Sequence, residues 1–455
     1  ALALHQATLG ATELRVQVGG QAGELGELGL RLALQSGRAE RVLAWAERCR
    51  AGSLRNRAAR PPADVDLAGR LAELRVVVRD VERLGFDGGD SSALLRRQAA
   101  LEDQVRRMAW MASGDRATLV SGPPHLDELG AALGDAALVE FVAHEDRLHA
   151  VVVSAGRARL HFLGAVPRVE GEVGALRFAL GRLARREGAA ASRAAAAQSL
   201  RFACGALDDI LLRPLARQID GRPLVLVPTG PLHALPWSTL PSCQGREVTL
   251  SPSAGLWLRA ATAAPTTPGD GRATVLVAGP GLAHAPEEIH QLSAAYPGAT
   301  ALFGSAATAG GVASALDGAA LVHVAAHGRF RADNPLFSSL RLADGPLTVY
   351  DLEALRVAPS RLVLSACDAG LSSVRPGDEL MGLASALLGM GSRSLVASVV
   401  AVPDDVTRPL MVDFHRRLAG GAGPAAALAG AQAAARGDDD FGLASTAGFV
   451  CFGAA

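Results

Sequence analysis

Two short segments of the sequence end in side chains that could react with a carbonyl carbon. One is "LVHVAAHG", which ends in His327 and Gly328, and the other is "LVLSACDAG", where Cys367 follows an apolar run forty positions later (367 − 327). An unperturbed thiol has a pKa of about 8.5, so only a few per cent of it is thiolate near neutral pH. A neighbouring imidazole can take the thiol proton and then protonate a leaving amine. This pair of residue types therefore indicates nucleophilic acyl transfer.

Small residues flank both reactive positions. We expect them to leave the backbone N–H groups of Gly328 and Cys367 accessible, so that the two amides form an oxyanion hole. Taken alone, a cysteine after an apolar run is more often a packing residue, because free cysteine is among the most buried residue types. The histidine and glycine at the end of a second apolar run favour the catalytic interpretation.

The elements that must position these side chains are short strands alternating with helices. After Pro223, β-branched runs such as "LVLVP", "TVLVAG", "RLVLSA" and "GFVCFG" alternate with helical stretches such as "APEEIHQLSAAY" and "GDELMGLASALLGM". This alternation predicts a mainly parallel sheet with helices on both faces. Reactive groups collect at the carboxyl ends of such strands. His327 and Cys367 would face one another if their two strands are neighbours in the sheet.

Upstream of this region, the sequence predicts helices and then a meander of antiparallel strands. Residues 1–60 are typical of a helical hairpin like one tetratricopeptide-type repeat, joined at Ser36-Gly37, and the absence of an initial Met favours the end of a longer repeat array. Residues 61–116 predict a longer, charged, coiled-coil-like hairpin. Strands and helices over 117–220 then precede a core over 221–455.

Six segments occur in the chain in this order: "LVLVPTGPLHALPWSTL", "LVHVAAHG", "NPLFSSLRLADGPLTVYDLEAL", "LVLSACDAG", "GDELMGLASALLGMGSRSLVASVVAVPD" and "STAGFVCFG". Together they resemble the CHAT family, the caspase-like domains associated with tetratricopeptide repeats, which are relatives of caspases and separases. The resemblance covers roughly 120–455 and is strongest from 223 onward. It implies a domain over 117–455 with a caspase-haemoglobinase-like fold and, in active members, a cysteine endopeptidase with a His–Cys dyad.

The family histidine falls on His327 and the family nucleophile on Cys367. His323 also lies where the family often has a histidine, and we expect it to form hydrogen bonds within the fold. Arg-specific relatives carry an acid two residues before the nucleophile, where this chain has Ser365.

The substrate pocket is therefore open to two interpretations. Asp368, Asp378 and Glu379 could supply acid to it, with Ser365 beside them, or Arg329 and Arg331 could instead select an acidic substrate residue. A third glycine is missing from the turn at Gly279 and Gly281, so that turn predicts no dinucleotide site.

Composition excludes several other functions. Lysine plus arginine equals aspartate plus glutamate at 45 each, so charge gives no reason to expect nucleic acid as a partner. The five cysteines lack the spacing of a zinc site, and we expect no metal and no cofactor. No apolar run reaches the roughly 18 residues of a spanning helix, and there is no signal-peptide pattern. These features predict a soluble protein of the reducing cytoplasm.

The sequence thus predicts a cytoplasmic cysteine endopeptidase acting on protein substrates. We expect a protein partner to bind the helical N-terminal region and activate the enzyme by ordering loops around 329–346 and 368–380. The alternative is a catalytically silent caspase-like scaffold in a signalling or defence complex. A nucleotide-binding switch is disfavoured, because the chain has no Walker motif.

Overall fold

The structure is a computed structural model of the 455-residue chain. It describes residues 23–50, 65–86, 89–111, 122–184, 189–264, 272–365, 373–375, 379–402, 404–436, 442 and 446–454.

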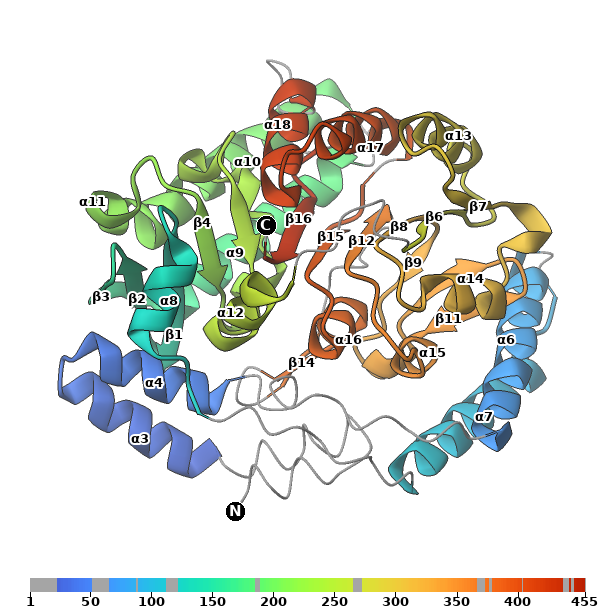
Figure 1. Ribbon diagram of the computed structural model, residues 1–455, viewed down its shortest axis with the longest axis horizontal. Coiled ribbons are helices and arrows are strands. Elements are labelled where there is room, and N and C mark those ends of the chain that lie inside the picture. Colours follow the sequence, from blue (N-terminus) through green and yellow to red (C-terminus); the bar gives the residue numbers. More distant parts are fainter. Residues whose placement is uncertain are drawn as a thin grey trace.

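One large sheet of eleven strands organises the molecule (Figure 1). Its strands lie in the order β3-β2-β1-β4-β5-β16-β15-β12-β8-β6-β7. In chain order these strands are β1 (Ala137–His144), β2 (Arg147–Ser154), β3 (Arg157–Ala165), β4 (Leu224–Val227), β5 (Val248–Leu250), β6 (Thr274–Ala278), β7 (Thr300–Leu302), β8 (Leu321–Ala325), β12 (Arg361–Ser365), β15 (Ser394–Ser398) and β16 (Phe449–Gly453).

The sheet consists of two parallel halves that run in opposite directions. In one half β1, β4, β5 and β16 are parallel to one another, and in the other half β15, β12, β8, β6 and β7 are. The halves meet where β16 pairs antiparallel with β15. Their carboxyl ends therefore lie at opposite edges of the sheet. The expected meander is also present, because β1, β2 and β3 pair antiparallel in sequence order.

Helices cover both faces of the sheet, as expected (Figure 1). Side chains alternate along each buried strand, so one face of β6 packs on α13 and the other joins the main core. The helices are α3 (Gly23–Gln35), α4 (Ala39–Cys49), α6 (Val65–Phe86), α7 (Ser92–Met111), α8 (Leu126–Leu133), α9 (Val166–Ala184), α10 (Ala190–Leu211), α11 (Ala216–Ile219), α12 (Ala254–Thr262), α13 (Ala285–Ala295), α14 (Ala309–Leu316), α15 (Val349–Glu353), α16 (Leu383–Met390), α17 (Asp404–Ala419) and α18 (Pro424–Ala435). In the part of the chain that is described, no helix is long and apolar enough to cross a membrane.

Two buried charged residues fix the hairpin of α3 and α4 to the sheet. Glu47 lies in α4, and Arg50 directly follows this helix. The Glu47 carboxylate accepts hydrogen bonds from the amides of Ala254 and Gly255, at 2.8 and 2.9 Å, at the N-terminus of α12. The Arg50 guanidinium donates to the carbonyl oxygen of Phe141 within β1 and to those of Val227 and Pro228 at the end of β4. The hairpin joined at Ser36-Gly37 is confirmed, and it packs against the sheet as part of the same folded body.

The second helical hairpin, α6 and α7, packs against a small sheet that follows His327. This sheet contains β9 (Gly328–Arg329), β10 (Ser339–Leu342) and β11 (Gly345–Thr348) in the order β11-β10-β9. Gly345 is pressed against the backbone of Arg75, where an added Cβ would lie 2.6 Å from the Arg75 carbonyl oxygen. Arg75 also forms a 2.6 Å ion pair with Asp351 of α15. The α6–α7 hairpin is therefore in direct contact with the chain that follows His327.

Two segments differ from the sequence-based expectation. The stretch 329–346, expected to be a loop that a partner orders, is partly strand in this structure, because β9, β10 and β11 pair with one another and β11 packs on α6. Residues 330–338 between β9 and β10 are not strand. The stretch from 377, expected to begin a helix, instead contains the strand β14 (Glu379–Met381), which pairs with β13 (Ser373–Arg375). Helix α16 starts only at Leu383, after Gly382. The turn between β10 and β11 is formed by Ala343 and Asp344.

Candidate functional site

The strands that precede His327 and Cys367 are direct neighbours. Strand β8 pairs in parallel with β12, and the register places Ala325 opposite Ser365 at the last pair of the ladder. His327 follows Ala325 by two residues, and Cys367 follows Ser365 by two residues. The two chains therefore leave the same edge of the sheet at the same level. Cys367 itself lies outside the described residues.

His327 is exposed, and its backbone is held by β10. The Arg341 amide donates a 2.8 Å hydrogen bond to the His327 carbonyl oxygen. This bond makes Leu340 and Gly328 a non-hydrogen-bonded pair in the antiparallel ladder. The N–H of Gly328 consequently points away from β10 and is directed to the other side of its chain.

The turn after β6 packs directly on the His327 imidazole. Gly281 has a φ of +84°, and a Cβ atom placed on it would lie 3.3 Å from Nε2 of His327 and 3.8 Å from Nη1 of Arg341. Gly279 allows an equally close approach, because its Cβ would lie 2.6 Å from Cβ of Ala326. The sequence predicted a turn here, which is confirmed. It did not reveal that the two glycines let this turn lie against the reactive histidine.

A hydrogen-bonded chain of four side chains lies buried behind β8. Nε2 of His323 is 2.8 Å from the Glu288 carboxylate, and Nδ1 of His323 is 2.9 Å from Nε2 of His415. Nδ1 of His415 is in turn 3.0 Å from the Tyr296 hydroxyl. The expectation that His323 forms hydrogen bonds within the fold is therefore confirmed.

The electrostatics of this chain keep His415 neutral. Complete burial lowers the pKa of His415 well below its ordinary value, and the neighbouring His323 lowers it further. Burial likewise raises the pKa of the Tyr296 hydroxyl. These groups join β8 to α13 and α17, so they fix the strand that carries His327.

The four predicted pocket residues are described by the structure to different extents. Ser365 is the last residue of β12 and is 5% exposed. Asp368 and Asp378 lie outside the described residues, and for Glu379 only the backbone, in β14, is described. All four remain predicted pocket residues.

The two arginines that could select an acidic substrate residue, Arg329 and Arg331, differ in their ion pairs and exposure. Arg331 forms ion pairs of 2.6 Å with both Glu102 of α7 and Asp333. Hydrogen bonds to Asp333 and then Glu102 raise the pKa of Arg331. Arg329 is exposed on β9. The charge of Arg331 is thus committed to α7, which leaves Arg329 as the better placed of the two.

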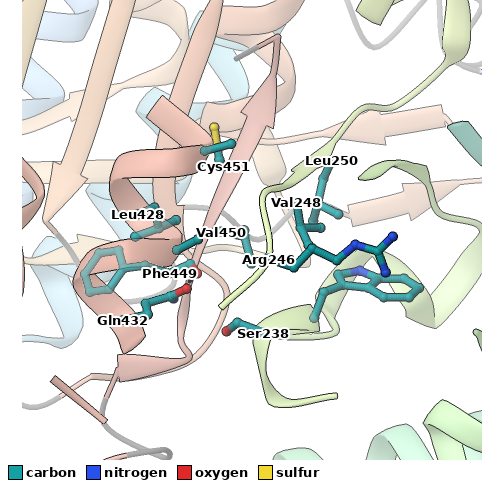
Figure 2. Close-up of a pocket in the computed structure, with 12 residues that line it drawn as sticks. Ser238, Arg246, Val248, Leu250, Leu428, Gln432, Phe449, Val450 and Cys451 are labelled. Carbon is teal, nitrogen blue, oxygen red and sulfur yellow. Dashed lines mark hydrogen bonds between the residues drawn. The ribbon is translucent and has the colours of Figure 1, made fainter. Parts of the chain in front are cut away.

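Two of the four described cysteines are poor nucleophiles. Burial raises the pKa of the Cys243 and Cys451 thiols to about 12. Cys204 is buried too, and Cys49 is half-buried where Gly26 of α3 meets α4. Figure 2 shows Cys451 on β16 beside a cavity between β5 and α18, whose volume is about 20 Å³. That space is enough for a water molecule and too small for a peptide.

Three further residues border the site that the sequence did not single out. Arg341 lies beside His327, and its Nε forms a 3.2 Å ion pair with Glu82 of α6. Glu102 of α7 holds Arg331. The sequence contained no signal for Glu82 and Glu102, because residues on α6 and α7 come close to β10 through tertiary packing alone. The Gly-Pro-Gly turn was the one local sequence signal beside His327. Within the described ranges, no group of three or more His, Cys, Asp and Glu side chains could hold a metal ion.

Comparisons with known proteins agree with the fold described above. The family model "CHAT domain" matches residues 201–454. No curated protein sequence matches the chain. Two crystal structures of the Saccharomyces cerevisiae separase–securin complex share the fold, with TM-scores of 0.55 and 0.52 at 9% and 10% identity. The matches cover 97% and 98% of this chain, which spans 37% and 38% of the length of those chains.

A third solved structure, the Arg-specific cysteine proteinase gingipain R, matches with a TM-score of 0.38 at 14% identity, covering 63% of this chain and 75% of that one. A TM-score this low does not establish a common fold. The separase matches and the family match do confirm the expected architecture, a mainly parallel caspase-like sheet with helices on both faces and a helical N-terminal region. Because the family model covers more than half of its residues, the chain belongs to the CHAT domain family.

Proposed function

We propose that the chain is a cysteine endopeptidase of the caspase and separase type, with Cys367 as nucleophile and His327 as general acid and base. One observation carries the proposal. The register of β8 and β12 ends both strands level, at Ala325 and Ser365, and each reactive residue follows its strand by two positions. A dyad needs hydrogen-bond reach or a modest closure, and chains that emerge side by side from one edge are suited to give it.

The proposed reaction needs only these two side chains and water. Sγ of Cys367 attacks the carbonyl carbon of the scissile bond while its proton passes to the His327 imidazole. His327 then gives that proton to the departing amine, leaving a thioester. Water attacks the thioester, giving one proton to His327, which returns it to the thiolate as the acid product leaves.

The negative oxygen of the tetrahedral intermediates would be held by the amides of Gly328 and Cys367. The orientation of the Gly328 N–H away from β10 supports the first of these donors. Loss of one such donor typically costs about 10²–10³ in rate. Ser365, Asp368, Asp378 and Glu379 remain our candidates for the substrate pocket.

The helical N-terminal region is proposed to receive an activating protein partner, in a cytoplasmic setting. The α6–α7 hairpin supports this role, because it holds the chain that follows His327 through Glu102–Arg331 and Glu82–Arg341. A partner that moves α6 or α7 would therefore move the backbone that supports His327. The related separase structures are complexes with securin, which is a precedent for protein partners in that protein.

Replacing Gly281 with alanine is expected to lower kcat/KM about tenfold or more without unfolding the protein. The new methyl group would lie 3.3 Å from Nε2 of His327, so the ring must move by a few tenths of an ångström. A misplacement of 1 Å in a catalytic group can cost on the order of 10² in rate, so this smaller shift is expected to cost about tenfold. The measurement is steady-state hydrolysis of a cleaved peptide, with circular dichroism as the folding check.

Gly298→Ala is the matched control for this substitution. Gly298 has a φ of +87°, so alanine is strained there to a similar degree, but nothing lies within 4 Å of its added Cβ. Equal losses in both variants would mean that backbone strain, not the contact with His327, causes the effect.

The proposal as a whole is tested by cysteine labelling and peptide hydrolysis in the unmodified chain. A cysteine-directed electrophile, located by peptide mapping, should label Cys367 at least tenfold faster than Cys49, because a neighbouring imidazole raises its thiolate fraction. A peptide library should contain at least one substrate, with and without candidate activating proteins. Labelling of Cys367 no faster than Cys49, together with no hydrolysis, would favour the silent scaffold.

A further inference from the structure

The large sheet has one long edge strand, β3 (Figure 1). The strand at the other edge, β7, has three residues, whereas β3 has nine, and every residue of β3 is at least partly exposed. Among the described residues, β3 pairs only with β2. Proteins commonly shorten or cover an edge strand, because its N–H and C=O groups can pair with another chain. The outer side of β3 is therefore open to an added strand.

The turn between β2 and β3 determines which backbone groups point outward. Ala155 and Gly156 form a two-residue turn with φ angles of +49° and +71°, as in a type I′ turn. Such a turn closes on a hydrogen-bonded pair, which here is Ser154 and Arg157. Hydrogen-bonded and non-hydrogen-bonded pairs alternate along an antiparallel ladder. The N–H and C=O groups directed away from β2 therefore belong to Ala158, Leu160 and Phe162.

The side chains of β3 give the two faces of this edge different chemistry. Arg159 is paired with Val152 of the main core, so Arg159 and Arg157 lie on the face covered by α9 and α10. Leu160 and Phe162 lie on the opposite face, where Phe162 is 57% exposed. A strand added at this edge would meet cationic side chains on one face and apolar side chains on the other.

No acidic residue of the β2–β3 hairpin balances its arginines. Residues 147–165 contain Arg147, Arg157 and Arg159 but no Asp or Glu. Arg157 and Arg159 are exposed, and neither forms an ion pair with a described residue. The cationic character of the edge is therefore a property of the hairpin itself.

The elements in contact with β3 do not supply the missing acid on the arginine face. There, α9 and η1 (Arg213–Leu215) each have one more basic than acidic residue, and α10 has two of each. On the opposite face, α4 has two of each. Helix α8 has two acidic residues and no basic one, and it approaches the hairpin on that opposite face, at the Gly156 turn. Arg157 and Arg159 thus remain without a carboxylate partner.

These charges decide what kind of strand fits the edge. Pairing β3 with a second copy of itself would bring Arg157 and Arg159 of both copies onto one face, and like charges on neighbouring strands are destabilising. Acidic side chains at every second position of an added strand would instead lie beside these arginines. Opposite charges across two strands stabilise the pairing.

We propose that the β3 edge binds an extended segment of another protein in which acidic residues alternate with apolar ones. The backbone of the segment pairs with the outward groups of Ala158, Leu160 and Phe162, which is the strand-addition mode of peptide recognition. Its acidic side chains lie beside Arg157 and Arg159, and its apolar side chains lie beside Leu160 and Phe162. Seven strands lie between β3 and β8, so this surface is separate from the proposed peptidase centre.

The test uses a library of synthetic peptides of about seven residues, a length typical of a paired strand, with Glu at alternate positions and Val, Ile, Leu or Phe between them. Library members should bind the full chain at one site per molecule and raise its melting temperature at saturation. The same peptides with Lys in place of Glu, or with alternate backbone amides methylated, should bind at least tenfold more weakly. No binding by any member, or equal binding of the Lys peptides, would overturn the proposal.

Charge reversal on β3 locates the bound peptide. Arg157→Glu combined with Arg159→Glu should weaken the Glu peptides at least tenfold and strengthen the Lys peptides. The matched control, Arg31→Glu combined with Arg96→Glu, reverses two exposed arginines on α3 and α7 and should leave binding unchanged. Equal losses in the two double variants would mean that overall charge, not the β3 edge, governs binding.

A proline substitution tests the backbone pairing. Leu160→Pro removes an outward N–H without removing a hydrogen bond to β2, so it should abolish peptide binding, whereas Leu160→Ala keeps that N–H and should retain more of it. A folded Leu160→Pro that binds as well as Leu160→Ala would exclude strand addition. If Leu160→Pro unfolds, the charge reversal still decides. A dimer of the chain that Leu160→Pro dissociates would assign the edge to a second copy and overturn the proposal. None of these outcomes depends on peptidase activity.

Discussion

Replacing Cys367 with alanine is expected to abolish peptide hydrolysis, and replacing His327 with alanine is expected to lower kcat/KM about 10²–10⁴-fold. Alanine at 367 removes the only atom that can form the thioester. Alanine at 327 removes the group that accepts the thiol proton and protonates the leaving amine, a role that typically supplies 10²–10⁴ in rate. The double variant should be no slower than Cys367→Ala, because the two residues act as a unit. Steady-state kinetics on one library peptide measures all three.

The controls for these substitutions are an exposed histidine and a half-buried cysteine, both away from the site. His290 is exposed on α13, and Cys49 is half-buried on α4, so His290→Ala and Cys49→Ala change the same residue types away from the site. Both should retain full activity. If His327→Ala hydrolyses the peptide as fast as these controls do, His327 is not the acid and base. If Cys367→Ala does so, the nucleophile has been assigned wrongly.

Replacing Arg50 with methionine is expected to lower the free energy of unfolding by about 3–5 kcal/mol. Arg50 is 3% exposed and donates to the carbonyl oxygens of Val227, Pro228 and Phe141. Its Nε also lies 3.9 Å from the carboxylate of Glu140, which is fully buried. Removing one member of a buried charge pair leaves the other charge poorly compensated in a low dielectric. Denaturant unfolding, followed by circular dichroism, measures the loss.

Two further variants separate the charge from the packing. Arg41→Met on the exposed side of α4 should change stability by no more than about 0.5 kcal/mol, because surface substitutions rarely do more. Adding Glu140→Leu to Arg50→Met should recover part of the loss, because it removes the buried carboxylate. A loss under 1 kcal/mol in Arg50→Met would show that α4 is not held to the sheet through this residue.

The alternation of apolar runs and helical stretches determined most of the architecture. Strands β4, β6, β8, β12 and β16, and helix α13, lie where the sequence placed them. Their signals are local, since burial on both faces demands a continuous apolar run and a covering helix demands helical spacing. The hairpins near residues 36 and 155 were equally readable, because Gly37 and Gly156 take positive φ angles there.

The short strands β5, β7, β9 and β10 were not predicted. Each has two to four residues and is held by pairing with a neighbour that is distant in sequence or by packing on α6. The strand β14 was mistaken for the start of α16, because "GDELMGLASALLGM" has helical composition throughout. Pairing with β13 overrides that local preference over Glu379–Met381.

The sequence by itself determined which residues could carry the chemistry, because a thiol and an imidazole at the ends of apolar runs are properties of residue type and local pattern. Only the tertiary structure decided that the strands are adjacent and level, since strand order and register depend on contacts between segments forty residues apart. The tertiary structure also decided what surrounds His327. The turn at Gly281 packs against its imidazole, Arg341 lies beside the same turn, and Glu82 of α6 pairs with Arg341. Such contacts leave no periodic trace in the chain.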